Sequence, residues 1–140
     1  MRIGFGSIIR DSNGRVVACC SQVCEANFDL DTTKAIAVWK GISFGIDCGL
    51  VCFVVETDSD TVINNIVKGG NSDSRYGCIL DYVAALVLAS RNVTYLNTSR
   101  KANRVVGILA NEALKISNKV ILMKDAPLAI RYLVESEQRG

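Results

Sequence analysis

Val51-Cys-Phe-Val-Val-Glu-Thr-Asp-Ser59 is the stretch that decides the fold class. Its first five residues are apolar and mostly β-branched or aromatic, which predicts a buried strand covered on both faces. Asp58 and Ser59 follow where the strand ends, and residues 60–67 carry apolar side chains at the spacing of one helical face. A carboxylate in this position lies where open α/β sheets bind ligands. The ordinary alternative is that Ser59 caps the helix and Asp58 is a first-turn acid.

Strand and helix patterns follow one another on both sides of this stretch. Asn13-Gly14 separates two strand-like runs, Ile3 to Arg10 and Arg15 to Ser21, and this dipeptide is a strong hairpin signal. The later elements are expected as a helix capped within Asp31-Thr-Thr33 and stopped by Gly49, the Val51 strand, a helix from Asp60, a helix from Tyr76 to Ser90, a strand from Val93 to Asn97, a helix from about Ala102, an extended piece from Val120 to Met123, and a small helix from Pro127 to about Ser136. This order predicts an α/β fold with a mixed sheet flanked by helices. The hairpin should be antiparallel, and the Val51 and Val93 strands parallel.

Composition places the chain among globular domains and excludes several classes. Its 140 residues are 49% apolar and 21% charged, enough for one domain with a normal core. The formal charge of +2 is too small to indicate nucleic-acid binding by itself, and no apolar run is long enough to span a bilayer. Six cysteines occur without a Cys-x-x-Cys pair and without histidine, so zinc-type spacing is absent. They are typical of buried residues in a reducing compartment, the cytoplasm or nucleus.

Five pieces of the chain, taken together, carry a family resemblance. They are Gly4-Phe-Gly-Ser-Ile-Ile-Arg-Asp-Ser-Asn-Gly14, Gly41-Ile-Ser-Phe-Gly-Ile-Asp-Cys-Gly-Leu50, Val54-Val-Glu-Thr-Asp-Ser59, Arg100-Lys-Ala-Asn-Arg-Val-Val106 and Ile121-Leu-Met-Lys-Asp-Ala-Pro-Leu-Ala-Ile130. In order and spacing they resemble the ribonuclease H-like domain, and more narrowly the plant form found with retrotransposon-type reverse transcriptases or encoded alone. The resemblance implies a single domain over residues 1–140, with a core of about 1–117 and a short C-terminal extension of 118–140.

The resemblance also implies a chemistry, hydrolysis of the RNA strand of an RNA–DNA hybrid. The family uses two divalent ions, normally magnesium, which bracket the scissile phosphate and need several carboxylate ligands. Of the four family acids, the third is present as Asp58, whereas the second and fourth correspond to Lys34 and Gly107. The first lies on a strand that precedes Gly4 in the family. We therefore expect weak or absent metal binding at Asp58, no cofactor in this chain, and no catalysis.

Both replaced positions have more than one interpretation. Lys34 is either an ordinary solvated lysine or an ammonium that forms an ion pair with Asp58 in place of a metal site. Its expected place in the first helical turn is unfavourable for a cation, so helix stability does not explain it. Gly107 costs about 1 kcal/mol relative to alanine inside a helix, unless a close packing contact requires it. Glu56, two residues from Asp58, is a possible substitute ligand.

The strand that precedes Gly4 in the family is central to that fold, between the hairpin and the Val51 strand. We expect it to be missing here because Met1 begins an incomplete gene model or a shortened chain. The sheet would then have a gap, or the hairpin would pair directly with the Val51 strand. An open sheet edge of this kind favours self-association or another protein partner.

Three functions compete on these grounds. The leading hypothesis is a nuclease-like domain that has lost hydrolysis and retains weak binding to an RNA–DNA hybrid or another nucleic acid, through Arg100, Lys101, Asn103 and Arg104. The second is a protein-interaction module or a non-functional retroelement remnant. The third is a working nuclease whose missing acid comes from upstream sequence; Lys34 and Gly107 argue against it. None of the three involves a membrane.

Overall fold

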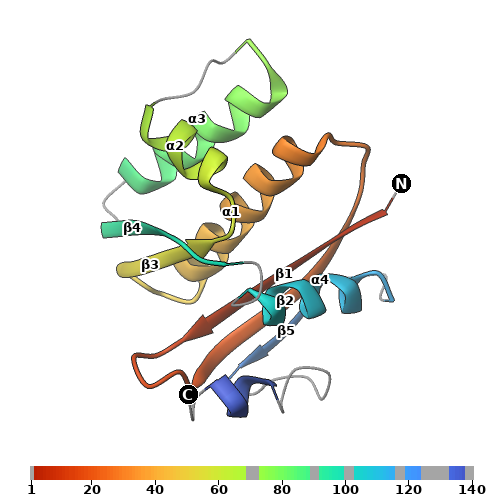
Figure 1. The fold of residues 1–140 in the computed structure, drawn as a ribbon, viewed down its shortest axis with the longest axis vertical. Coiled ribbons are helices and arrows are strands. Elements are labelled where there is room, and N and C mark those ends of the chain that lie inside the picture. The colour runs from red at the N-terminus through yellow and green to blue at the C-terminus, as the bar shows by residue number, and fades with distance from the viewer. Residues whose placement is uncertain are drawn as a thin grey trace. The chain divides into compact units, whose positions relative to one another are not determined.

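Strands and helices follow the order that the sequence predicts (Figure 1). The computed structural model describes residues 2–68, 73–88, 92–99, 103–115, 119–123 and 133–137. Its elements are β1 (Arg2–Arg10), β2 (Val16–Glu25), α1 (Leu30–Asp47), β3 (Cys52–Thr57), α2 (Asp60–Lys68), α3 (Arg75–Leu88), β4 (Asn92–Asn97), α4 (Arg104–Ala113) and β5 (Val120–Met123). Residues 133–137 are also helical. By its internal contacts the chain divides into two compact units, Met1–Asn27 with Ala102–Gly140 (unit 1) and Phe28–Lys101 (unit 2).

Unit 1 contains an antiparallel sheet in the order β1-β2-β5. The predicted hairpin is confirmed: β1 and β2 pair from Arg2↔Glu25 to Arg10↔Val16. Asp11 shapes the turn because its Oδ1 accepts hydrogen bonds from the backbone N–H groups of Asn13 (2.9 Å) and Arg15 (3.0 Å). Gly14 has a φ of +79°, a conformation that glycine adopts without steric cost. The extended piece predicted at Val120 is β5, which pairs with β2.

Helix α4 packs closely on one face of this sheet. A Cβ on Gly4 would lie 1.9 Å from the Ala110 carbonyl oxygen, and one on Gly6 would lie 2.5 Å from the Leu109 Cβ. Only residues without a side chain allow so close an approach of helix and strand. On β2, the buried Ser21 hydroxyl donates a 2.9 Å hydrogen bond to the Leu109 carbonyl, which joins the helix to the next strand.

The core of unit 1 draws on its C-terminal segment as well as on the hairpin and α4. Its buried cluster consists of Cys19, Val105, Leu109 and Val134. Val134 lies in the helical stretch 133–137, and Glu137 at the end of that stretch forms an ion pair with Arg10 of β1. The segment after residue 118 thus supplies both a strand and a core side chain. The first part of the helix predicted from Pro127 lies outside the described residues.

Unit 2 contains a parallel pair of strands together with α1, α2 and α3. Within the described residues β3 pairs with β4 and with no other strand, in register from Cys52↔Asn92 to Thr57↔Asn97. The predicted parallel arrangement is confirmed. Helices α1 and α3 contact each other at Trp39 and Tyr82, whose ring centroids are 6.1 Å apart. Helices α2 and α3 are joined by a 2.8 Å hydrogen bond from Asn65 Nδ2 to the Tyr76 hydroxyl.

Helix α1 ends as predicted but begins earlier than predicted. Its N-cap is Asp29, whose carboxylate accepts a 2.7 Å hydrogen bond from the Thr32 N–H, and not a residue within Asp31-Thr-Thr33. Asp29 was not predicted as the N-cap because the segment around it has a composition typical of loops. At the other end Gly49 has a φ of +86° and donates its N–H to the Ile46 carbonyl, a common helix termination.

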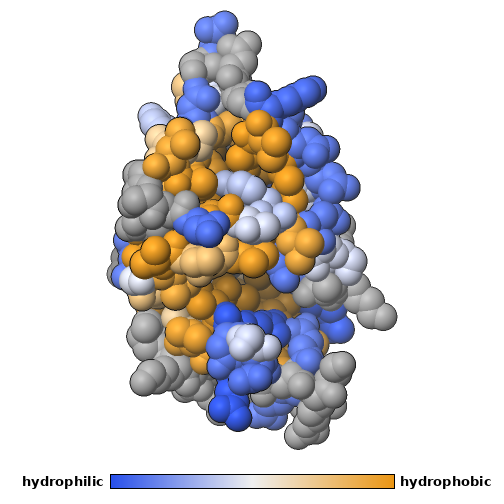
Figure 2. Space-filling view, turned by 90° about the vertical axis from the view of Figure 1, so that its left-hand side faces the viewer, coloured by the Kyte–Doolittle hydropathy of each residue, from blue (hydrophilic) through white to orange (hydrophobic). Residues whose placement is uncertain are grey.

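One prediction about β3 is wrong: the strand is not covered on both faces. Its burial alternates, with Phe53 and Val55 half-buried and Val54 57% exposed. The apolar run mimics a doubly buried strand, but in this two-stranded sheet only one face is packed. Figure 2 views the side where β3 and β4 begin in Figure 1, and hydrophobic residues reach the surface there. The exposed large apolar side chains of unit 2 include Val51, Val54, Leu88 and Leu96.

Candidate functional site

Asp58 follows the carboxyl end of β3, where the sequence places it. The strand ends at Thr57, whose carbonyl accepts a 2.8 Å hydrogen bond from the Thr98 N–H after β4. Ser59 caps α2 because its buried hydroxyl accepts a 3.3 Å hydrogen bond from the Val62 N–H. Asp58 therefore lies immediately before the N-cap of α2, and its side chain is half-buried. The acidic residue in the first turn of α2 is Asp60. The alternative interpretation is correct for Ser59, whereas Asp58 precedes the cap and does not lie in the first turn.

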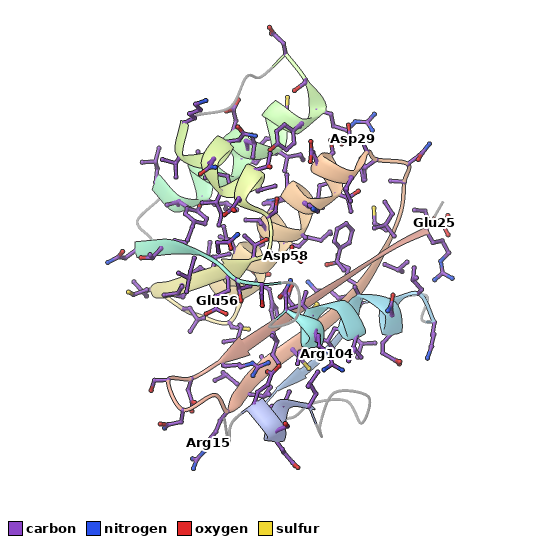
Figure 3. All side chains as sticks on the ribbon, viewed as in Figure 1. Arg15, Glu25, Asp29, Glu56, Asp58 and Arg104 are labelled. Atoms are coloured by element: carbon purple, nitrogen blue, oxygen red, sulfur yellow. The ribbon has the colours of Figure 1, made fainter. Side chains whose placement is uncertain are left out.

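Glu56, the possible substitute ligand, lies on the exposed face of β3 (Figure 3). It is opposite Leu96 of β4 in the parallel register, and Leu96 is 51% exposed. Asp58 has a more enclosed position than Glu56. The two carboxylates therefore have different surroundings although only one residue separates them.

Lys34 lies in the N-terminal half of α1 and is half-buried. Because the helix starts at Leu30, Lys34 is in its second turn, and the unfavourable first-turn placement expected from the sequence does not apply. The first turn holds the acid Asp31 instead. Lys34 and Asp58 belong to the same unit, and the ion pair between them stays a prediction.

Gly107 lies in the middle of α4 and is exposed. No atom of the described residues lies within 4 Å of a Cβ at this position, so close packing against them does not explain the glycine. In α4 the tight approach occurs against Gly4 and Gly6 of β1, as described above. Gly107 belongs to unit 1 and Asp58 to unit 2. The family resemblance implies that the two positions lie close together at one end of the sheet, and this stays a prediction.

The start of α4 carries the described part of the predicted basic cluster. Asn103 is the N-cap and makes no side-chain capping hydrogen bond, and Arg104 is the first helical residue, with an exposed side chain (Figure 3). No acidic residue occurs in the first turn of α4. A positive side chain and the positive end of the helix dipole thus coincide, which favours anions. Arg100 and Lys101 lie outside the described residues.

These residues do not fit a two-magnesium centre. Within the described ranges, no group of three or more histidine, cysteine, aspartate or glutamate side chains is close enough to hold a metal ion. At Lys34 and Gly107, which the family resemblance predicts to be acid positions, the chain has an ammonium and no side chain. Magnesium needs hard oxygen ligands in near-octahedral geometry, and neither of these two side chains supplies one. Nor does any described helix have the length and apolarity to span a membrane.

Two groups of unit 2 have shifted pKa values. Hydrogen bonds from the Thr32 side chain and backbone lower the pKa of Asp29, and the nearby Arg75 contributes to this shift. The Arg75 guanidinium also lies 5.2 Å from the Phe28 ring centroid. In β4, burial raises the pKa of Tyr95, whose hydroxyl is buried and has no hydrogen-bond partner among the described residues. The sequence gives no signal for Tyr95, whose burial depends on contacts between separate elements. The Asp29 site is local, because its main partner Thr32 lies three residues further along the chain.

Comparison with known proteins identifies the family. The family model described as "Reverse transcriptase-like" matches residues 2–113. Among solved structures, ribonuclease H1 from the archaeon Halobacterium salinarum NRC-1 superposes with a TM-score of 0.58 at 15% identity, covering 81% of this chain and 97% of that one. The N-terminal ribonuclease H domain of a Mycobacterium tuberculosis protein, solved as a fusion with maltose-binding protein, gives a TM-score of 0.55 at 16% identity, covering 81% and 91%. No curated protein matches the sequence. The chain therefore belongs to the reverse transcriptase-like family and has the fold of a ribonuclease H domain.

Proposed function

We propose that this chain is a ribonuclease H-like domain that binds nucleic acid weakly and does not hydrolyse it. Family membership supports the nucleic-acid role, since the similar solved structures are ribonucleases H. We further propose a plant-type, retroelement-derived origin, on the motifs quoted above, and an intracellular site of action. None of the six cysteines is in a disulfide, which suits a reducing compartment.

The observation that carries the binding proposal is the positive start of α4. The exposed Arg104, the uncapped helix N-terminus and the absence of first-turn acids create a local anion site in a chain of net charge +2. Phosphate contacts of this kind give affinity without sequence specificity. An A-form hybrid offers its phosphates and 2′-hydroxyls to such a surface.

The test is a fluorescence-anisotropy titration with an RNA–DNA hybrid, duplex DNA and single strands at several salt concentrations. Arg104→Ala should weaken binding and reduce the magnitude of the log–log salt slope by about 1, the effect of losing one phosphate contact. Arg15→Ala is the matched control, because Arg15 is also exposed but lies at the β1–β2 hairpin (Figure 3). Equal effects of the two substitutions, or no binding to any substrate, would overturn the proposal.

Loss of hydrolysis is proposed from the residues at the acid positions. An ammonium at Lys34 and a missing side chain at Gly107 leave Asp58 as the one retained acid within the described positions. We therefore propose that no catalytic magnesium is held. The measurement is a magnesium-dependent cleavage assay on an RNA–DNA hybrid, with the expectation of no product above background.

A second role is favoured by the sheet topology. The described strands form two small sheets. Within the described residues, each outermost strand of a sheet is hydrogen-bonded to another strand along only one of its two edges. Open edges recruit further strands. We propose that the chain self-associates through such an edge, and a molar mass that rises with concentration in sedimentation equilibrium would be the supporting result.

A further inference from the structure

The β1–β2 hairpin places a chemically reactive dipeptide at an exposed position of unit 1. Asn13 is exposed in the turn of residues 11–15, and Gly14 follows it; the label of Arg15 marks this turn in Figure 3. In such a dipeptide the backbone nitrogen of the second residue can attack the amide carbon of the asparagine side chain and close a succinimide ring. Glycine hinders this attack least because it has no side chain and its backbone is the most permissive. The nucleic-acid role proposed above does not use these two residues.

The other asparagines of the chain lack this neighbour. Asn13-Gly14 is the only Asn-Gly pair in the 140-residue sequence. Asn92 and Asn111 are also exposed, but they precede a valine and a glutamate, whose side chains crowd the attacking nitrogen. Asn111 also lies within α4, where the helical backbone fixes the following N–H. These two asparagines therefore serve as internal references for Asn13.

The folded turn restrains this reaction. The Gly14 N–H donates a 3.0 Å hydrogen bond to the Asp11 carbonyl. Attack requires the Gly14 nitrogen to lose this proton and to direct its lone pair at the Asn13 side chain, which it cannot do while the N–H points at the carbonyl. The Asp11 carboxylate adds to the restraint, because its Oδ1 accepts hydrogen bonds from the N–H groups of Asn13 (2.9 Å) and Arg15 (3.0 Å). The closed turn is therefore unreactive, and the reaction belongs to a locally opened state.

We propose that Asn13-Gly14 is a site of spontaneous deamidation and that Asp11 controls its rate by holding the turn closed. When the turn opens, the Gly14 nitrogen loses its proton to solvent and forms a bond to the Asn13 Cγ. The Cγ–Nδ2 bond breaks, and the amide nitrogen takes up a proton and leaves as ammonia. Water then adds to one of the two ring carbonyls and opens the succinimide, which leaves either aspartate or isoaspartate at position 13. Nothing is oxidised or reduced, and water is the only co-reactant.

The two products differ in their effect on the hairpin. Both replace a neutral amide by a carboxylate and so lower the formal net charge of +2 by one unit. Aspartate keeps the length of the main chain, whereas isoaspartate adds a methylene group to it within the turn. Strand pairing ends directly beside this turn at Arg10↔Val16, and Arg10 also forms the ion pair with Glu137. We therefore expect isoaspartate to weaken the hairpin at this end, and aspartate to leave the fold nearly unchanged.

Peptide mapping by mass spectrometry tests the site, after prolonged incubation of the folded protein in a mildly alkaline buffer. The peptide that contains Asn13 should separate into aspartate and isoaspartate forms, while the peptides that contain Asn92 and Asn111 keep their amides. Asn13→Gln is the matched variant: its longer side chain would have to close a larger ring, which forms more slowly, so no conversion is expected at this position. No conversion of Asn13 in the wild type, or equal conversion at Asn111, would overturn the proposal.

Substitutions at Asp11 test the control by the turn. Asp11→Ala should raise the deamidation rate of Asn13 about tenfold, the effect of one or two net hydrogen bonds on the opening equilibrium. Asp11→Asn keeps an acceptor oxygen and should give an intermediate rate, so the comparison survives if the alanine variant does not fold. Ser12→Ala, at an exposed position of the same turn, is the control and should leave the rate unchanged.

Two further measurements separate turn opening from a direct chemical effect of Asp11. Hydrogen exchange of the Gly14 amide should accelerate in parallel with deamidation, because both require the open turn. In urea, where the turn is absent, the wild type and Asp11→Ala should deamidate at the same rate, and faster than either folded protein. An unchanged rate in the folded Asp11 variants, or a difference that persists in urea, would refute the control by the turn.

Discussion

At the scale of single residues, Gly6 and Gly107 of unit 1 differ in whether their surroundings require a glycine. Gly6 is required because a Cβ there would lie 2.5 Å from both the Leu109 Cβ and the Val106 carbonyl oxygen. Gly107 is exposed within a helix, and none of the described residues would contact a Cβ there. The same residue type therefore has opposite consequences on the two elements that pack together.

The corresponding prediction is a pair of alanine substitutions. Gly107→Ala should stabilise the protein by up to about 1 kcal/mol, the difference in helix propensity between the two residues. Gly6→Ala should destabilise it by about 1–3 kcal/mol, because helix and strand must separate to admit the methyl group. Urea unfolding measures both free energies. A stability loss in Gly107→Ala would show that the space at this position is filled in solution.

Tyr95 is predicted to be more stable without its hydroxyl. A buried hydroxyl without a partner has lost its hydration and gained no hydrogen bond, so Tyr95→Phe should stabilise the protein by about 1 kcal/mol. Tyr76→Phe is the control: it removes the acceptor of the 2.8 Å hydrogen bond from Asn65 and should destabilise the protein by about the same amount. Equal and unfavourable effects of the two substitutions would contradict the prediction, because they would mean that the Tyr95 hydroxyl has a partner.

At the scale of elements, the N-terminus of α1 depends on one ionised carboxylate. Asp29 accepts the Thr32 N–H, and its pKa is lowered from the ordinary value of 3.8, mainly by hydrogen bonds from Thr32. A lowered folded-state pKa means that the unfolded chain binds the proton more tightly. The stabilisation by Asp29 is therefore complete above the ordinary pKa and is lost as the pH falls below it through the folded-state value.

This pH dependence is tested with two substitutions at one position. Asp29→Ala should lower the free energy of unfolding at neutral pH, and its deficit should shrink as the pH falls below about 4. Asp29→Asn keeps a capping oxygen without the charge, so it should be less harmful and should lack that acid-dependent change. Urea unfolding of the three proteins from acid to neutral pH makes the comparison. A deficit of Asp29→Ala that is constant across this range would contradict the role of the ionised form.

Most elements could be predicted from the sequence because their signals are local. Asn13-Gly14 specifies the hairpin, Gly49 ends α1, and the apolar spacing after Ser59 specifies α2. The start of α1 was missed because Asp29 is one of several capping residues in a short stretch. The exposed face of β3 was missed for another reason. An apolar run indicates that a strand tends to be buried, but other parts of the chain decide whether an element packs against each of its faces.

At the scale of the whole molecule, the candidate site is harder to predict than the elements. Asp58 could be located from sequence because a strand end is a local feature. Lys34 and Gly107 can be assigned to the candidate site only through the family pattern, because neither residue is chemically unusual on its own helix. At Gly107 the structure excludes one explanation of the glycine, since none of the described residues packs closely enough to require it. It also removes the dipole argument at Lys34, which lies in the second turn of α1.

The last prediction concerns catalysis and follows from charge. Two magnesium ions need several carboxylates, whereas Asp58 with an ammonium at Lys34 would offer about zero net charge. The chain as it stands should show no magnesium-dependent cleavage of an RNA–DNA hybrid, and Asp58→Asn should change nothing.

Restoration tests the same reasoning in the opposite direction. Lys34→Glu and Gly107→Asp, made together and combined with an upstream strand that ends in aspartate, should bring hydrolysis back if the scaffold positions the acids correctly. Because such acids act as a unit, each change alone should do almost nothing. The matched control carries Lys34→Gln and Gly107→Asn with the same upstream strand, which reproduces the side-chain volumes without the charges. Metal-dependent turnover by the unmodified chain, abolished by Asp58→Asn, would show that other ligands complete the site, and Glu56 would be the first to substitute because it lies two positions before Asp58.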